Sequence, residues 1–200
     1  MSSRIRVVTG PTVEPVTVDE VKTLTHVSHS VEDDLILRWI KTARQLAEGY
    51  QWRAYITQTL ELSFDGFPSM PIEIPRSPLQ SVTSIKYTDY LGTETTLYEA
   101  GNTDMFLVDT EGEPGRIDLA YNQVWPSVTL RTLSPVQIVF VAGYGDSADD
   151  VPDQVKDAIL MYCGWRYENR AVETGWGMRG RVVPAAFFEI LRDNRARSQL

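Results

Sequence analysis

The sequence predicts an α+β fold in which a small α-helical bundle is interrupted by an antiparallel β insertion. Apolar residues recur at helical spacing from about residue 17 to 50 and again from 152, whereas between 55 and 141 they alternate with a period of two. Neither helical part carries enough apolar surface for a core of its own, so we expect the two parts to pack together. The predicted divisions are residues 1–54, 55–145 and 146–200.

The first division should begin with an extended arm and continue as two helices. Residues 1–16 contain two prolines and no helical period. Thr17 and Glu20 fit a capping box at the start of a short helix. Ser30 can cap the next helix, in which apolar residues from 35 to 50 form one face. The opposite, polar face of this helix is expected to carry Arg38, Lys41, Arg44 and Glu48.

The middle division reads as short strands separated by turns. Residues 56–65 alternate between apolar and polar side chains, as a half-buried strand should. Further strands are predicted at 72–74, 82–87, 95–98, 105–108, 116–119, 128–130 and 136–141. The last of these is a nearly continuous apolar run, which predicts burial on both faces.

The third division returns to helices. Asp149 or Asp150 can cap a helix with Pro152 in its first turn, and this helix should run to about residue 169. Residues 171–183 are rich in glycine and lack a period, which predicts a flexible loop. A final C-terminal helix is predicted to open at Pro184.

Composition limits the possible functions. The chain has 200 residues, 42% of them apolar, which suffices for a packed core. The net charge is −8, with a net −10 in residues 55–150, so this acidic middle should not bind duplex DNA non-specifically. A single cysteine excludes an intrachain disulfide, and we find neither a membrane-length apolar run nor the apolar core of a signal peptide. These features predict a chain made in the cytoplasm.

No group of residues points to catalysis, a cofactor or a metal. His26 and His29 lack the third and fourth ligands that zinc usually takes. The acidic cluster from Asp146 to Asp153 lacks the spacing of a calcium-binding loop and reads as helix capping. Cys163 has no histidine near it in sequence and reads as a small packing residue.

The C-terminal segment combines arginine with aromatic residues, a composition typical of interface anchors. The candidate partner contacts are Trp176, Arg179, Arg181, Phe187, Phe188, Leu191, Arg192, Arg195 and Arg197. The alternative is that the last helix closes the core of the chain itself, with Phe187 or Leu191 buried.

Nine short stretches of the sequence occur in an order that is characteristic when they are taken together. They are Val16–Lys22, Ile56–Thr59, Asp65–Pro68, Pro75–Val82, Pro114–Ile117, Trp125–Pro126, Val141–Gly145, Val151–Pro152 and Tyr167–Arg170. Together they resemble the head–tail connector proteins of long-tailed phages and prophages, also called head-completion or adaptor proteins. The resemblance runs from about residue 14 to residue 192 and implies the same interrupted helical bundle.

The resemblance also implies a function. Such adaptors form a ring, usually of twelve copies, beneath the portal protein, and the ring extends the DNA channel. The implied partners are the portal, which the C-terminal segment of related adaptors grips, neighbouring copies of the chain, a stopper or tail-completion protein, and genomic DNA that passes without sequence-specific binding. The expected location is the neck of the virion, after assembly in the bacterial cytoplasm and without a membrane. The family is not known for catalysis and implies no catalytic residue or cofactor.

Two other functions stay open at this point. A carbohydrate- or receptor-binding β module could stack sugars on Tyr87, Tyr90, Tyr98, Tyr121 and Trp125. A hydrolase could use a pair of the many carboxylates in the insertion, although no spacing selects one pair.

Overall fold

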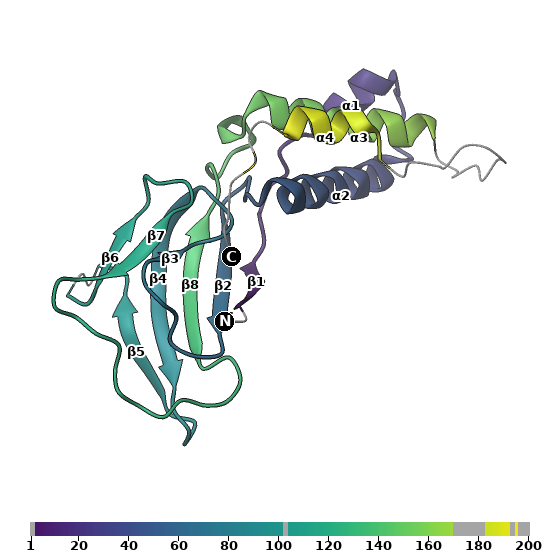
Figure 1. Cartoon of the computed structure of the whole chain (residues 1–200). Helices are drawn as coiled ribbons and strands as arrows, with labels where there is room; N and C mark the ends of the chain where they lie inside the picture. The colour runs from purple at the N-terminus through teal and green to yellow at the C-terminus, as the bar shows by residue number, and fades with distance from the viewer. Residues whose placement is uncertain (1–2, 102–103, 170–182, 193–194, 196–200) are drawn as a thin grey trace. The chain divides into compact units, whose positions relative to one another are not determined.

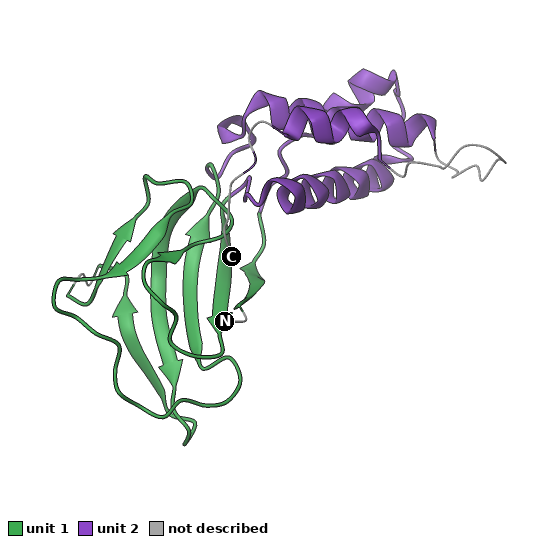
Figure 2. Cartoon of the chain, in the orientation of Figure 1, with its two compact units in different colours: residues 1–11, 57–144, 196–200 green, residues 12–56, 145–195 purple. Residues whose placement is uncertain are grey.

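The structure is a computed structural model that describes residues 3–101, 104–169, 183–192 and 195. The chain forms two compact units, coloured separately in Figure 2. Among the described residues, the helical unit comprises residues 12–56, 145–169, 183–192 and 195, and the β unit comprises residues 3–11, 57–101 and 104–144. The β unit therefore draws most of its chain from the segment between the two helical parts, and the α+β fold is confirmed.

The helical unit joins the N-terminal and C-terminal helices in one core, as the sequence predicts. Its elements are α1 (Val18–Thr25), α2 (Asp33–Gln51), the 3-10 turn η1 (Ala148–Asp150), α3 (Asp153–Glu168) and α4 (Ala185–Leu191). Helix α3 packs against α1 and α2, and α4 packs against α2 and α3 (Figure 1). Trp39 of α2 and Ile159 of α3 are both buried, so each contributes to the core of this unit.

The helix starts show which capping signals the chain uses. Thr17 and Glu20 form the predicted capping box, in which the Thr17 hydroxyl accepts from the Glu20 amide at 3.2 Å. The prediction that Ser30 caps α2 is wrong, because the helix begins after Glu32 and no side chain caps it. The prediction that Asp149 or Asp150 caps the next helix is also wrong, because α3 begins directly after Pro152 without a side-chain cap. The capping hydroxyl in this region is that of Ser147, at the start of η1.

The β unit holds two antiparallel sheets. The larger sheet has the order β1-β2-β8-β4-β5 and the smaller has the order β3-β7-β6. The strands are β1 (Ser3–Thr9), β2 (Gln58–Phe64), β3 (Ile72–Glu73), β4 (Leu79–Thr88), β5 (Glu94–Glu99), β6 (Phe106–Asp109), β7 (Arg116–Leu119) and β8 (Val136–Ala142). In the larger sheet β2 and β4 flank the central strand β8.

Aromatic side chains join the small sheet to one face of the large one. Tyr98 of β5 meets Phe106 of β6 edge to face, with ring centres 6.2 Å apart. Phe67 stacks on Trp125 at 4.7 Å and contacts Tyr87 of β4 at 5.7 Å. The Trp125 indole N–H donates to the main-chain oxygen of residue 68 at 2.9 Å. These contacts enclose the core of the β unit.

Four sequence-based predictions about strands need correction. Strand β2 is not half-buried, because Glu61 and Ser63 are buried as well as Leu60 and Leu62. Strand β8 is not buried on both faces, because residues 137, 139 and 141 are only partly covered. Residues 128–130 form no strand and contribute one isolated bridge, between Asp89 and Leu130. Residues 3–9 of the expected arm are paired with β2 as the edge strand β1, since Ile5 and Val7 alternate with Arg4 and Arg6.

Candidate interaction surface

The apolar side of helix α4 is buried against the other helices of its unit. Phe187 and Leu191, four residues apart, have an exposed fraction of 0%. The Phe187 ring lies 5.7 Å from the ring of Tyr162 on α3. Residues at this spacing share one face of a helix, so this face belongs to the core of the helical unit.

The other side of the C-terminal segment is accessible. Phe188 is half-buried and packs on Tyr50 of α2 at 5.0 Å. The guanidinium of Arg195 lies over the same Tyr50 ring, 5.4 Å from its centre. Arg192 is exposed and pairs with Glu189 at 3.0 Å. A solvent-facing group of one aromatic and two arginine side chains therefore surrounds the end of α4.

The predicted partner contacts fall into three groups. Phe187 and Leu191 serve the core, which is the alternative that the sequence left open. Phe188, Arg192 and Arg195 lie at the accessible end of α4. The remaining candidates, Trp176, Arg179, Arg181 and Arg197, lie outside the described residues, as do residues 171–182 of the expected loop.

A polar network fixes the end of α4 to α2. The Gln51 side-chain amide donates to the main-chain oxygen of Leu191 at 2.7 Å. The Tyr55 hydroxyl donates to the Gln51 side-chain oxygen at 2.6 Å, and Tyr55 is fully buried. Residue 55 lies just before the chain leaves for the β unit, so the network orders that exit and the last helix together.

The network continues through a buried arginine. Arg44 donates to Glu48 at 2.8 Å and to Glu14 at 2.7 Å, and Glu48 also accepts from the Tyr55 amide at 3.0 Å. Burial by itself lowers the pKa of Arg44, but the hydrogen bond to Glu14 and the charge of Glu48 outweigh it and the pKa is raised. Arg44 and Glu48 are each 7% exposed, so the face of α2 predicted to be polar is buried at these two positions.

The ion pairs of the β unit are more exposed than the Arg44 pairs of the helical unit. Arg6 of β1 donates to both carboxylate oxygens of Glu61 on β2, at 2.9 and 2.7 Å. The hydrogen bond from Arg116 and that from the residue 112 amide lower the pKa of Asp109. The hydrogen bond to Glu94 raises the pKa of Lys86.

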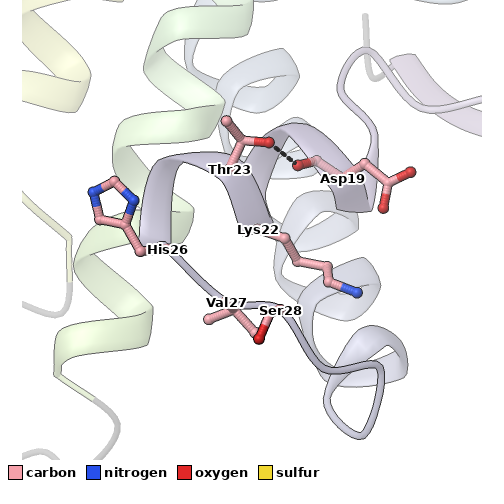
Figure 3. A pocket seen from close by; sticks show the side chains of 6 residues that line it. All are labelled: Asp19, Lys22, Thr23, His26, Val27 and Ser28. Carbon is pink, nitrogen blue, oxygen red and sulfur yellow. Dashed lines mark hydrogen bonds between the residues drawn. The ribbon is translucent and has the colours of Figure 1, made fainter.

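The hollows on the described surface do not bring together a set of side chains suited to catalysis or ligand binding. Figure 3 shows one at the end of α1, where His26 and Lys22 point away from each other. Lys22 pairs instead with Asp33 at 3.1 Å, and the Thr23 hydroxyl donates to the Asp19 carbonyl. A second hollow lies over β6 and β7, beside the Asp109–Arg116 pair.

The described part of the chain also gives no sign of a metal site, a membrane-spanning helix or a reactive thiol. No cluster of three or more His, Cys, Asp or Glu side chains is placed to hold a metal there. Its helices are also too short or too polar to cross a membrane. Cys163 is fully buried, and burial raises the pKa of its thiol to about 12, which suits a packing residue.

The aromatic residues of the carbohydrate alternative do not form one platform. Tyr87 and Tyr98 are buried, and the half-buried Trp125 has one ring face covered by Phe67, with ring centres 4.7 Å apart. Only Tyr90 and Tyr121 of the five are well exposed, at 66% and 99%. Sugar stacking needs accessible ring faces, so the geometry does not favour this alternative.

Comparison with known proteins identifies relatives by structure. A chain from the neck of an empty GTA particle, computed with C6 symmetry, superposes with a TM-score of 0.76 at 20% identity over 98% of this chain and 97% of that one. The fold is that of a particle-neck chain. A chain from the virion of the native gene transfer agent (GTA) particle gives the same values. A chain from the neck of the native particle, computed with C12 symmetry, has a TM-score of 0.72 at 20% identity and covers 100% of this chain and 98% of that one.

These likenesses agree with the resemblance to head–tail connector proteins carried by the sequence, and at 20% identity they show a shared fold. Neither a scan against protein-family models nor a search of curated proteins finds a match.

Sequence reasoning missed the polar network and the pairing of β1. The Arg44–Glu48 spacing of four residues was visible, but Glu14 lies 30 residues away in sequence and nothing local marks it as a partner. The alternation of Arg4 to Val7 was a usable signal for a strand.

Proposed function

We propose that this chain is a structural component of the neck of a phage-like particle, a head–tail adaptor that forms a ring beneath the portal. The observation that carries the proposal is the fold shared with chains of GTA necks over almost the full length of both chains. In this role the ring extends the DNA channel and offers a docking surface to the next connector or tail protein. The proposed function is non-enzymatic.

Ring assembly is supported by the symmetry of the related particles. The necks of those particles were computed with C6 and C12 symmetry. A closed ring requires a heterologous contact, in which two different surfaces of each copy meet. The present proposal is a ring of twelve copies, matching the higher of the two symmetries.

Charge supports a channel role for part of the chain. Residues 55–150 carry fourteen acidic and four basic side chains. A wall of net negative charge repels the DNA phosphates, so DNA can move past it without being held.

Among the described residues, we propose that the accessible end of α4 contacts the portal. Arg192 and Arg195 are exposed, and Phe188 gives the surface an apolar centre. Arginine beside an aromatic ring suits a partner that offers carboxylates around an apolar groove. The core side chains Phe187 and Leu191 would position this surface rather than contact the portal.

Electron microscopy tests the proposal directly. The protein is imaged alone and after mixing with the portal protein encoded by the same particle. We expect rings coaxial with the portal in the mixture. A portal that stays bare at saturating protein, or a stable closed dimer in both samples, would overturn the adaptor function.

Charge reversal tests the contact surface separately. Arg192→Glu combined with Arg195→Glu should weaken portal attachment and reduce its sensitivity to salt. Arg38→Glu combined with Lys41→Glu, an equal charge reversal at two exposed positions of α2, is the matched control. Unchanged attachment of the double variant would exclude this end of α4 from the contact and leave the adaptor function to the imaging result.

A further inference from the structure

The larger sheet of the β unit has two open edges. The strand order begins at β1 and ends at β5, and no described strand pairs with the outer side of either. Val7 and Val8 of β1 are 56% and 50% exposed, and Thr95 and Thr96 of β5 are also exposed. An open edge presents unpaired N–H and C=O groups to which another strand can add.

The two edges carry opposite charge. Residues 3–11 contain Arg4 and Arg6 and no acidic side chain. Strand β5 contains Glu94 and Glu99 and no basic side chain, and Glu94 pairs with Lys86 of β4 at 2.8 Å. Two β1 edges would therefore repel each other, as would two β5 edges, whereas β1 attracts β5. Such a pattern disfavours closed dimers and favours one head-to-tail contact.

The register of the sheet places the charges at matching heights. Following the paired residues across the five strands, one row runs Arg6, Glu61, Val139, Ser84 and Glu99. Arg6 and Glu99 thus end the same row on opposite edges. Arg6 is engaged with Glu61 of its own chain. Arg4 lies two residues away on the same face, is exposed, and is within diagonal reach of a carboxylate added beside Arg6.

We propose that β1 of one copy pairs with β5 of the next copy, so that the five-stranded sheets join edge to edge. The contact places Glu99 of one chain beside Arg4 and Arg6 of its neighbour. The inference rests on the proposed ring and names the surfaces by which the copies meet.

The topology also fixes the direction of the new pairing. All neighbours in the five-stranded sheet are antiparallel, so β1 and β5 run in the same direction. In a ring of many copies each copy turns by a small angle relative to the last. The joined strands of adjacent copies are therefore parallel. Parallel strands within one chain need a long crossover connection, but strands from two different copies do not.

Cross-linking between copies tests the pairing. Ser3 and Thr95 end another common row, which runs through Phe64, Val136 and Tyr87. Ser3→Cys and Thr95→Cys are small changes, and the native Cys163 is fully buried. The double variant is assembled on the portal and treated with a short bis-maleimide. We expect a ladder of covalent oligomers, while each single variant alone gives no linked pair.

The outcomes separate this inference from the proposed function. Rings seen by microscopy without a ladder overturn the β1–β5 contact and leave the adaptor function standing. Links formed by Ser3→Cys alone would show a symmetric β1 contact and overturn it as well. The absence of rings on the portal overturns both.

Charge exchange provides a second test of the same contact. Arg4→Glu and Glu99→Arg should each raise the protein concentration needed for half-maximal ring assembly by about tenfold or more, because like charges then meet. Combining the two changes should restore assembly, since the pair is then reversed. Arg38→Glu, which lies on α2, should leave assembly unchanged. A double variant as impaired as the sum of the two single variants would overturn the proposed pairing.

Discussion

The side-chain amide of Gln51 donates to the main-chain carbonyl of Leu191 at 2.7 Å, joining two residues that are 140 positions apart. Gln51 ends α2 and Leu191 ends α4, and both are buried. One hydrogen bond thus ties the last helix of the chain to the helix that precedes the β unit. The surface that we assign to the portal is positioned by this bond.

Gln51→Leu should destabilise the helical unit by about 1–3 kcal/mol, because the Leu191 carbonyl and the Tyr55 hydroxyl both lose a buried partner. Urea unfolding followed by circular dichroism measures the change. Gln45→Leu, on the exposed side of the same helix, is the control and should stay within about 0.5 kcal/mol of the parent. Equal stabilities for the two variants would mean that the network contributes nothing.

Arg44→Met should cost about 3–5 kcal/mol, because it leaves the Glu14 and Glu48 carboxylates in a protein-covered site without their cation. Arg38→Met, at an exposed position of α2, should have little effect. The thermal melting curves of the two variants decide the matter. A stable Arg44→Met protein would show that solvent reaches these carboxylates.

Phe187→Ala and Phe188→Ala should separate core from surface. Phe187→Ala removes a fully buried ring and should destabilise by about 3–5 kcal/mol. Phe188 is half-buried, so Phe188→Ala should destabilise the protein less than Phe187→Ala does. Its main effect should be weaker attachment to the portal. Paired measurements of melting temperature and portal binding test this. The assignment fails if Phe188→Ala binds the portal with full affinity.

The Asp109 carboxyl should titrate below its ordinary range, since Arg116 and a main-chain amide hydrogen-bond its charged form. Because the pKa is lowered on folding, the resulting stabilisation is present above the ordinary carboxyl pKa and is lost as the pH falls through the lowered value. Arg116→Gln should raise the pKa toward normal. Carbon-detected NMR titration of Asp109 reads this shift, and an identical curve in both proteins would refute the pairing.

Cys163 should resist thiol reagents in the folded protein, since its side chain is buried and its pKa is raised to about 12. Treatment at pH 8 should label the thiol only after urea is added. Rapid labelling without urea would contradict the burial of α3 at this position.

Local patterns explain which parts of the fold could be predicted. The capping box at Thr17 and the apolar face of α2 lie within a few residues of sequence, so their periods are readable. The burial of Arg44 depends on Glu14, and the half-covered state of β8 depends on what packs beside it in space. Tertiary contacts of that kind leave no periodic signal.

The candidate site divides in the same way. The mixture of aromatic and arginine residues near the C-terminus could be read from composition, but composition does not show which side of a helix is buried. Phe187 and Phe188 are adjacent in sequence and have different environments, the first in the core and the second at its edge. The opposite charges of β1 and β5 became informative only when the strand order placed them at the two ends of one sheet.

The most direct test of the central claim is cryo-electron microscopy of the neck in purified particles from the cell that makes this chain. The account predicts density for both units of the chain in a ring between the portal and the tail, with β1 of each copy beside β5 of the next. Density for this chain elsewhere in the particle, or particles that lack the chain altogether, would contradict it.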